Sequence, residues 1–515
     1  MKTAAAVLAL LVLFLSPASG QEVPIGRSLV QAALAADGEQ RAEAVEALLA
    51  VEDSVDRVAG WFAEGRDYGD KIPTGWLEKT VIGSDGVERA YLLHVPKDYD
   101  PAKRYRMVVD MHGGVSRPKA LTHAELGEMK FFWGAPAEKG GWILALPAGQ
   151  KGAEWWTEVG AGNVLSILRE TKRCYNVNED LVFATGFSDG GSGSFYMALA
   201  HPTPFAGFIP LSGHVGVARL GGLQVHLKNL QNKPLYITNT EKDSLYPSAG
   251  VKPLIDAMKR LAVDVVWRDI PEFTHNPMYL PDERPKILDW MREFRRDPHP
   301  TFAAWEGAAG APCRVHWLTD VKVGGEGSDD VFPDVNPMLT STRIQLGITV
   351  DQAFAGPGAK VDTVAEESAA EEAALKPGDV IVTMDGAEIG GLGELRTAIR
   401  KKKPGDAFTL VVQREGKNLD LSGTFPKPQP RPAFPREAPF GTVDVRRHGQ
   451  VFAAKTNRVT SFALLLSPDF VDFAMPVKVV VNDEVVFDAV VKPDLKFLVT
   501  QALEDEDRRL IYAAK

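Results

Sequence analysis

One serine of this chain has a glycine two residues before it and another two residues after it, a spacing that allows a sharp turn to expose a nucleophile. Ser188 lies in the segment Gly-Phe-Ser-Asp-Gly-Gly, after the apolar run 181–184 and before the small-residue stretch 192–200. This order predicts a buried strand, a sharp turn and a helix. Such a turn lifts the serine hydroxyl clear of the sheet. Gly186 and Gly190 are expected there because a Cβ would meet the neighbouring strand or helix. We therefore predict that Ser188 is a nucleophile at a helix N-terminus whose N–H groups face the reacting carbonyl oxygen.

A loop upstream of this turn can complete an oxyanion hole. Residues 105–111 have the pattern of a buried strand and run directly into His112-Gly113-Gly114. Chains with this type of serine turn carry a second oxyanion donor on such a loop. We expect the hole to use the N–H of Asp189 together with one from the loop, Gly114 in preference to Gly113.

The candidates for the catalytic acid and base lie on loops that follow two later predicted strands. Glu241 and Asp243 lie in a polar turn after one predicted strand, and His275 lies on the loop after the next. Nucleophile, acid and histidine then follow one another in the order typical of α/β-hydrolases. We predict His275 as the base and Asp243 as the acid that orients it, with Glu241 as the alternative acid. His112 and His214 compete less well as bases, because the first precedes the serine and the second precedes the acid-bearing strand.

Residues from about 75 to 295 resemble the polyhydroxybutyrate-depolymerase and feruloyl-esterase branch of the α/β-hydrolases, and are also similar to the phospholipase/carboxylesterase group. The matching pieces are the segment 91–99, the loop 112–114, the segment 175–178 and the serine turn. The resemblance implies an α/β-hydrolase fold, with a mostly parallel sheet and flanking helices, and a serine ester hydrolase that works through an acyl-enzyme. Many relatives carry Ala where this chain has Asp189, and we expect this carboxylate to disfavour anionic acyl groups.

Two adjacent tryptophans are candidates for a substrate pocket. Trp155 and Trp156 lie on the predicted loop 149–159. Aromatic rings supply large apolar area to flat substrates, so either ring can wall an acyl or alcohol pocket. The alternative is that one of them is core packing.

A second module lies between about residues 341 and 426 and resembles a bacterial PDZ domain. Its matching pieces are Leu346-Gly347-Ile348, the segment 375–381 and, in order, the segments 404–406 and 410–417. A PDZ fold is an α+β domain that leaves a sheet edge open to an added peptide strand. The resemblance implies a peptide or protein partner, with Leu346, Gly347 and Ile348 in the groove. Relatives usually have Gly where this chain has Ala374.

The remaining segments suggest how the domains are arranged. Short β-rich runs on both sides of the PDZ-like module predict one small β domain that the module interrupts. The segment before the hydrolase is rich in Ala, Leu and Glu and predicts a pair of amphipathic helices packed on the hydrolase. The expected divisions are a signal peptide at 1–20, a helical segment at 21–70, the hydrolase at 71–298, a β-rich domain at 299–340 and 430–515, and the PDZ-like domain at 341–426.

The N-terminus and the composition constrain location and partners. Lys2 followed by the apolar run 4–15 predicts a signal peptide cleaved after Gly20, and the run is too short to span a membrane. We therefore expect an exported protein, periplasmic or secreted. The 58 basic and 68 acidic residues give a net charge of -10, which disfavours nucleic acid as a partner. No Cys/His cluster has metal-ligand spacing and no phosphate loop appears, so neither metal nor other cofactor is expected. The sequence leaves open whether Cys174 and Cys313 pair.

Three functions remain in competition. The first is an exported serine esterase whose PDZ-like and β domains serve targeting or assembly. The second is a PDZ scaffold whose hydrolase domain is a degenerate binding module, which the filled triad and oxyanion positions disfavour. The third is a peptidase of the prolyl-oligopeptidase type, which ranks below the esterase because no propeller precedes the hydrolase.

Overall fold

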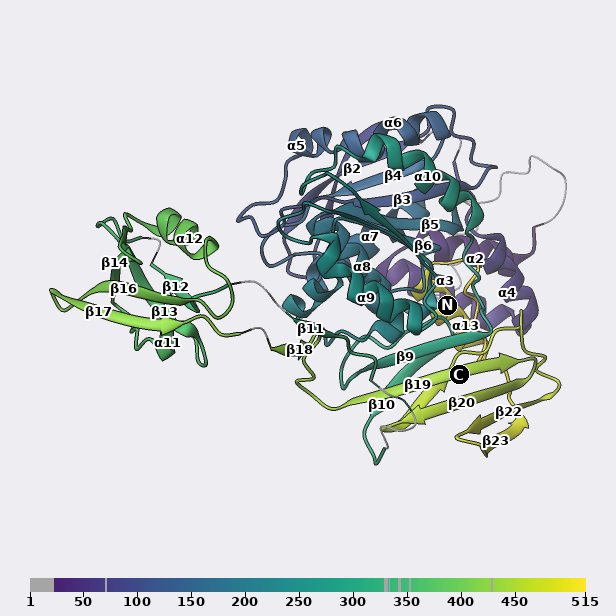
Figure 1. Ribbon diagram of the computed structural model, residues 1–515. Helices are drawn as coiled ribbons and strands as arrows, with labels where there is room; N and C mark the ends of the chain where they lie inside the picture. The colour runs from purple at the N-terminus through teal and green to yellow at the C-terminus, as the bar shows by residue number, and fades with distance from the viewer. Residues whose placement is uncertain are drawn as a thin grey trace. The chain divides into compact units, whose positions relative to one another are not determined.

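The computed structural model describes residues 23–69, 72–327, 332, 334–340, 344–351, 353–427 and 429–515. The predicted signal peptide at 1–20 lies outside the described residues. The chain divides into two compact units, one formed by Met1–Pro337 with Phe434–Lys515 and the other by Met338–Ala433 (Figure 1).

An eight-stranded sheet forms the centre of the first unit, in the order β1-β2-β4-β3-β5-β6-β7-β8. The pairs β1–β2 and β2–β4 are antiparallel, and every later pair in this order is parallel. The strands are β1 (Gly75–Ile82), β2 (Glu88–Val95), β3 (Tyr105–Met111), β4 (Ile143–Pro147), β5 (Val177–Phe187), β6 (Gly207–Leu211), β7 (Leu235–Thr240) and β8 (Val265–Ile270). All residues of β4 and β6 are buried, as expected for strands covered on both faces. The predicted fold class, an α/β domain with a mostly parallel sheet, is confirmed.

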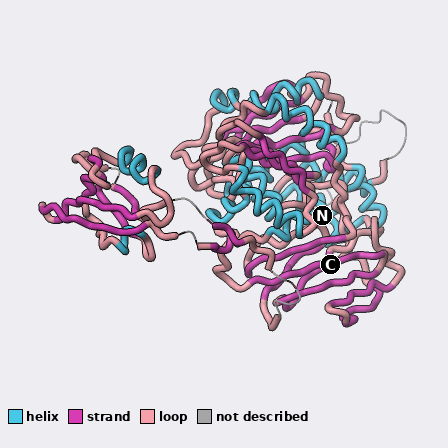
Figure 2. Tube along the Cα trace, in the orientation of Figure 1, coloured by secondary structure: helices cyan, strands magenta, loops and turns pink. Residues whose placement is uncertain are grey.

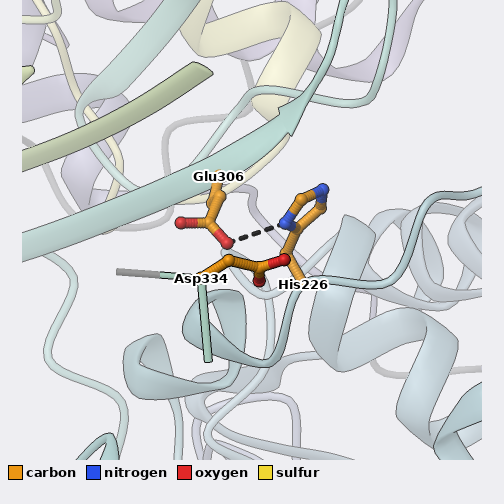
Figure 3. A group of neighbouring side chains, drawn as sticks. All are labelled: His226, Glu306 and Asp334. Atoms are coloured by element: carbon orange, nitrogen blue, oxygen red, sulfur yellow. Dashed lines mark hydrogen bonds and ion pairs between the residues drawn. The ribbon is translucent and has the colours of Figure 1, made fainter. Parts of the chain in front are cut away.

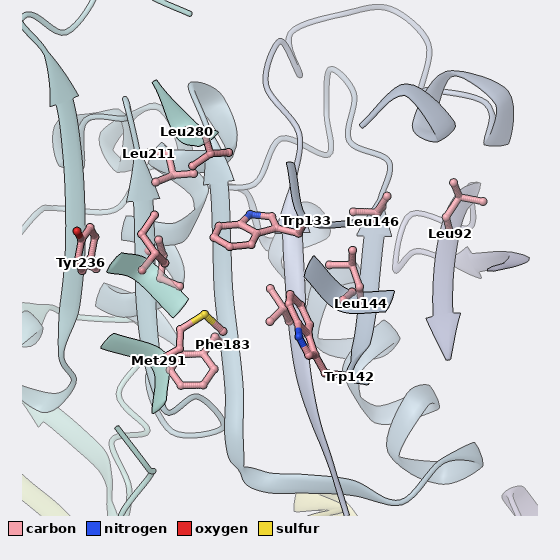
Figure 4. Close-up of a cluster of buried hydrophobic side chains, with 14 of the residues drawn as sticks. Leu92, Trp133, Trp142, Leu144, Leu146, Phe183, Leu211, Tyr236, Leu280 and Met291 are labelled. Carbon is pink, nitrogen blue, oxygen red and sulfur yellow. The ribbon is translucent and has the colours of Figure 1, made fainter. Parts of the chain in front are cut away.

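Helices flank the sheet (Figure 2). They are α5 (His123–Glu128), α6 (Lys130–Gly140), α7 (Glu158–Cys174), α8 (Asp189–Ala200), α9 (Ser248–Arg260) and α10 (Leu280–Glu293), with two 3-10 turns, η1 (Val215–Gly221) and η2 (Leu227–Asn232). Trp133 of α6 and Leu280 and Met291 of α10 join Leu144 and Phe183 of the strands in one apolar cluster (Figure 4). Every residue of α8 after Asp189 is buried, and the half that follows the serine turn, residues 190–194, has only glycine and serine.

A five-stranded sheet in the order β23-β22-β20-β19-β9 takes strands from both sides of the second unit. Its strands are β9 (Phe302–Ala308), β19 (Phe440–His448), β20 (Val451–Asn457), β22 (Pro476–Val481) and β23 (Glu484–Val490). A separate pair joins β10 (Leu318–Val323) to β21 (Val459–Leu464). Asn482 and Asp483, both at positive φ, form the tight turn between β22 and β23.

The N-terminal segment differs from the expected pair of helices on the hydrolase. It forms three helices, α2 (Ile25–Ala35), α3 (Gly38–Val51) and α4 (Val55–Glu64), whose apolar core includes α13 (Leu495–Asp505) near the C-terminus. A pairing between the two ends of a chain has no local signal, so the sequence pattern showed the helices but not their partner. No helix among the described residues is long and apolar enough to cross a membrane.

Buried ion pairs attach the C-terminal segment to the domain built on the eight-stranded sheet. The Asp507 carboxylate accepts bonds from Lys172 Nζ at 2.9 Å and from both terminal nitrogens of Arg296 at 2.8 Å. Burial alone would raise the pKa of Asp507, but the charges of Arg296 and Lys172 outweigh it and hold the pKa below its usual value. Nearby, Arg508 Nε donates to Glu179 at 2.6 Å.

The second unit is a small α+β domain. Its main sheet runs β12 (Ile348–Val350), β13 (Ala359–Val364), β14 (Val380–Met384), β16 (Ala407–Arg414) and β17 (Lys417–Thr424), with β15 (Ala387–Glu388) on β14. Two helices, α11 (Ala369–Glu372) and α12 (Leu392–Arg400), accompany it, and β11 (Met338–Thr340) pairs with β18 (Pro430–Pro432). Ala374 has φ +59, a conformation that favours glycine.

Candidate active site

The turn that carries Ser188 is strained and closely packed. Ser188 has φ 60 and ψ -118 between β5 and α8, and its N–H donates to Leu211 O at 2.9 Å. A Cβ added at Gly186 would lie 2.3 Å from Met111 O, and one at Gly190 would lie 1.7 Å from the same atom. The end of β3 therefore excludes any side chain at either position, as the sequence suggested.

Ser188, His275 and Asp243 lie in one hydrogen-bonded line. His275 Nε2 is 2.8 Å from Ser188 Oγ, and His275 Nδ1 is 2.7 Å from Asp243 Oδ2. Asp243 Oδ1 accepts the backbone N–H groups of Leu245 and Tyr246 at 2.7 and 2.9 Å. The Asp243 side chain is fully buried, whereas 18% of the His275 side chain is exposed. The acid is thus fixed and shielded, while the imidazole is open to a substrate.

Two neighbouring loops hold the acid and the histidine in register. Asp243 follows β7 and His275 follows β8. The backbone N–H of Lys242 donates to Phe273 O at 2.9 Å, and Thr240 Oγ1 donates to Thr274 O at 2.9 Å. Glu241, the alternative acid, is exposed and accepts the backbone N–H of Glu272, so its carboxylate ties the two loops together. The structure does not bring Glu241 to His275.

The predicted oxyanion donors surround the serine. Asp189 is the first residue of α8, so its N–H has no carbonyl partner within the helix. Gly113 lies so close to the nucleophile that a Cβ on it would be 3.0 Å from Ser188 Cβ, and Gly114 has φ +66. The structure therefore brings Gly113 to the side of Ser188, next to which Asp189 stands in sequence, and Gly114 follows Gly113 in the same loop.

Asp189 has a contact that the sequence did not reveal. Its Oδ2 accepts the backbone N–H of Val115 at 2.9 Å, which links the serine turn to the oxyanion loop. Val115 is fully buried. A contact between residues 74 positions apart leaves no trace in the local pattern, although the acid at 189 was itself the unusual feature of the motif.

His112 supports the same loop. Gly149 N–H donates to His112 Nε2 at 2.9 Å, so the ring proton is on Nδ1, which donates to Gly113 O at 2.8 Å. Burial lowers the pKa of His112 to about 4, which keeps the ring neutral. His112 is thus a loop-holding residue.

The expectation that Trp155 and Trp156 wall a substrate pocket is corrected by their burial. Trp155 is fully buried and Trp156 is 4% exposed. Trp155 Nε1 donates to His112 O at 2.8 Å, and α8 packs so tightly on this side chain that a Cβ at Gly193 would be 2.4 Å from the Trp155 Cβ and 2.8 Å from its ring atom Cγ. Both rings belong to the core, and Trp155 acts as a further support of the oxyanion loop.

Other side chains form the rim of the site. The Phe187 ring lies 5.1 Å from the His275 ring, and the Tyr246 ring contacts it edge-on at 6.0 Å. Leu245 and Met278, two and three residues past Asp243 and His275, are 61% and 63% exposed. His214 stacks on Tyr246 and accepts Gly216 N–H, and burial lowers its pKa to about 4. The surroundings of Ser188 are therefore largely apolar and aromatic.

His226, Glu306 and Asp334 approach one another closely enough to suggest a metal site (Figure 3). Gln224 Oε1 accepts two backbone N–H groups, so its Nε2 is the donor that faces His226 Nε2 at 3.1 Å. The proton of His226 is then on Nδ1, the atom that points at Glu306 Oε1 at 2.7 Å. Arg436 binds both oxygens of Asp334, at 2.8 and 2.6 Å. The cluster lacks the free imidazole lone pair that a metal needs, so it does not fit a metal ion.

The predicted peptide groove of the second unit lies at a sheet edge. β12 begins at Ile348 and pairs only with β13 among the described strands. Leu346 O accepts Ala370 N–H and Gly347 O accepts Ala365 N–H, both at 2.8 Å. Gly347 has φ +85, and a Cβ there would lie 2.2 Å from the Ser368 side chain. The loop is thus held at the start of an open edge strand.

Comparisons with known proteins agree with this division. Residues 344–423 match the family model of the PDZ domain, so the resemblance of the inserted module is confirmed. A probable periplasmic serine endoprotease, DegP-like, from Chlamydia trachomatis is 42% identical over 67 residues, which are 13% of this chain and 14% of that protein. A probable feruloyl esterase C from Aspergillus terreus is 29% identical over 129 residues, 25% of this chain and 47% of that protein. The chain thus spans less than half the length of either curated relative.

Among solved structures, similar chains include esterases. A thermostable esterase has a TM-score of 0.36 at 21% identity and covers 43% of this chain and 63% of its own. A ferulic acid esterase has a TM-score of 0.35 at 15% identity, and the match covers 43% of this chain and 99% of that esterase.

The two cysteines that the sequence left open do not pair: Cys174 and Cys313 are both free thiols in this structure.

Proposed function

We propose that this chain is a serine hydrolase that cleaves carboxylic esters through an acyl-enzyme. Ser188 is the nucleophile, His275 the general base and Asp243 the residue that orients the base. The observation that carries the proposal is the unbroken line from Asp243 Oδ2 through the two His275 nitrogens to Ser188 Oγ, with steps of 2.7 and 2.8 Å. A nucleophile, a base and an orienting group within hydrogen-bond reach are the recognised geometry for acyl transfer.

The proton follows this line. Asp243 holds the proton of the neutral imidazole on Nδ1, so Nε2 is free to accept the proton of the Ser188 hydroxyl as Oγ attacks the ester carbonyl. The N–H of Asp189 and one from Gly114 or Gly113 stabilise the oxyanion. When the intermediate collapses, His275 gives the proton to the leaving alkoxide. Water then repeats the same steps on the acyl-enzyme and releases the carboxylic acid.

The rim of the site supports an uncharged, apolar acyl or alcohol group. Leu245 and Met278 present exposed apolar side chains beside the acid and the base, and Phe187 lies against the His275 ring. The Asp189 carboxylate next to the nucleophile disfavours an anionic group at the same place. A relative described as a probable feruloyl esterase makes aromatic acyl esters suitable first substrates.

We further propose that the protein is exported and that the second unit captures an extended peptide. The apolar run 4–15 after Lys2 is the basis of export. The open edge of β12 offers unpaired backbone groups for an added strand, and Leu346, Gly347 and Ile348 lie at its start. The curated periplasmic proteases match this chain over 65 to 80 residues, too short a stretch to include a whole hydrolase domain. They therefore do not argue for peptide cleavage.

One purified sample tests the catalytic proposal. Wild-type protein is offered short acyl esters, feruloyl esters and peptides, and is separately treated with a fluorophosphonate reagent followed by mass analysis. We expect ester turnover, one phosphonyl group on Ser188, and neither in Ser188→Ala. Peptide turnover without ester turnover would favour the peptidase. A folded wild-type protein that neither turns over esters nor becomes labelled would favour a non-catalytic PDZ scaffold.

A further inference from the structure

The β domain ends in an exposed edge strand. β23 pairs only with β22 among the described strands, and all seven of its residues are exposed. Four of them are large and apolar: Val485, Val486, Phe487 and Val490 are 57%, 59%, 41% and 53% exposed. Proteins usually blunt such an edge with proline, bulky charge or a covering segment, because its free N–H and C=O groups attract another strand. β23 contains no proline, and its Asp488 is already paired with Lys478 at 3.0 Å. Its register against β22 shifts at Val486, which leaves Phe487–Val490 as the regular part of the edge.

The charges at the two ends of this edge are complementary to each other. Glu484 opens the strand and Lys492 lies just past its end, and both are exposed. No ion pair of either side chain is recorded among the described residues. When two identical strands pair antiparallel, the first end of each strand lies beside the last end of its copy. An acid at the first end and a base at the last end therefore form two acid–base pairs, one on each side of the symmetry axis.

We propose that two copies of this chain associate through β23, paired antiparallel about a two-fold axis at Asp488. In the regular part of the strand Phe487 of each copy meets Ala489 of the other, and beside it Val486 meets Val490, so these apolar side chains face apolar ones. Glu484 of each copy then lies near Lys492 of the other, beyond the register shift at Val486. This inference does not rest on the proposed hydrolase activity.

Neighbouring registers fit less well. Successive side chains of a strand point to opposite faces of the sheet. With a two-fold axis perpendicular to the sheet, paired residues must point to the same face, so alternative registers differ from the proposed one by steps of two residues. A shift one way sets Glu484 against Val490 and Asp488 against Val486, and a shift the other way sets Lys492 against Val486. In the proposed register the two Asp488 side chains meet at the axis, where the Lys478 that binds each of them balances the charge.

A hollow beside the strand adds apolar surface to the interface. A groove of about 750 Å³ lies between β21 and the β22–β23 hairpin. Its lining includes Phe462, Val479, Val481, Val486 and Phe487. A second β23 along this edge would extend the apolar wall formed by Val486 and Phe487 and remove part of it from water.

Sedimentation analysis over a concentration series tests the dimer. At about 100 μM protein, a dimer with a Kd of about 1 μM is almost fully formed. We expect wild type at twice the mass of one chain, Val486→Lys at the mass of one chain, and Val51→Lys unchanged from wild type. Val51 is the matched control, because it is also a valine with 59% exposure but lies at the end of α3.

Charge reversal tests the register. Glu484→Lys and Lys492→Glu should each weaken the dimer at least tenfold in Kd, and the double variant should restore it. These two side chains are exposed, so the test holds even if Val486→Lys fails to fold. A monomeric wild type, a dimer that Val486→Lys leaves intact, or a double variant without recovery would each overturn the proposal.

Discussion

The bond between the Asp189 carboxylate and the Val115 N–H predicts a specific kinetic defect. Asp189→Ala leaves the backbone of the serine turn in place but removes the acceptor that ties the oxyanion loop to it. Because Val115 is fully buried, its N–H would lose its partner in a place that water does not reach. An unsatisfied buried donor costs about 1–3 kcal/mol. The loop that carries Gly113 and Gly114 is therefore free to shift away from the nucleophile.

The cost translates into a rate. A barrier increase of about 1.36 kcal/mol slows a reaction tenfold, so Asp189→Ala should lower kcat by about 5-fold to 150-fold. The loss in kcat should not exceed that caused by removing a whole oxyanion donor, which is about 10²-fold to 10³-fold. Asp189→Asn keeps an acceptor oxygen and exchanges a charge-assisted bond for a neutral one. We expect that variant to lose about 1 kcal/mol at most, or about fivefold.

Steady-state kinetics on a small ester, with kcat and KM determined separately, is the assay. The defect should fall on kcat, because the hole binds the transition state rather than the ester carbonyl of the bound substrate. The pH profile should keep its shape, since the line from Ser188 to Asp243 is untouched. Wild-type kcat in Asp189→Ala would refute the reasoning. Equal losses in the Ala and Asn variants would show that the charge matters and the hydrogen bond does not.

Further outcomes test the base, the attachment of the C-terminal segment, the second unit and the insertion. His275→Ala should lose about 10⁴-fold or more in kcat, whereas His214→Ala should not, as ester hydrolysis by the two variants would show. Asp507→Asn should lower the free energy of unfolding by about 3–5 kcal/mol, because it leaves buried cations unpaired. Since the folded pKa of Asp507 is depressed, the stability that its carboxylate contributes is present above the unfolded pKa of about 3.9 and is lost as the pH falls below it. The free energy of unfolding, measured in urea at a series of decreasing pH values, should therefore fall less steeply with pH in the variant than in wild type. Ala374→Gly should stabilise the second unit by about 1 kcal/mol, because φ +59 strains a side chain, and a higher melting temperature would show it. Replacing Met338–Ala433 by a short Gly/Ser linker should leave small-ester turnover near wild type, and a folded variant without turnover would contradict this.

The local parts of the site were predictable because their chemistry is local. The serine turn needs glycine on both sides of the strained residue, and the close approach of Met111 O to Gly186 and Gly190 shows why. The positions of Asp243 and His275 followed from the order of strands, since parallel strands present their following loops at one edge of the sheet. The structure brings these residues together, and their catalytic role remains a prediction.

What the sequence did not show depends on contacts between distant segments. Trp155 looks the same in sequence whether it lines a pocket or fills a core, and its burial depends on the close approach of α8 at Gly193. The helices α2 and α4 have clear amphipathic patterns, but their partner α13 lies more than 400 residues later. A buried face specifies that something must cover it and does not specify what does.

The same reasoning explains how the β domain can accept an inserted unit. Asn336 Nδ2 donates to Phe434 O at 2.6 Å, and Phe434 N–H donates back to Asn336 Oδ1 at 3.0 Å. Arg436 binds Asp334 through two nitrogens, and a third bond joins it to Val225 O at 2.7 Å. These contacts hold together the chain ends that lead to and from Met338–Ala433, and all of them lie within the first unit. Because the ends already meet, the strands on either side need no help from the inserted residues to pair.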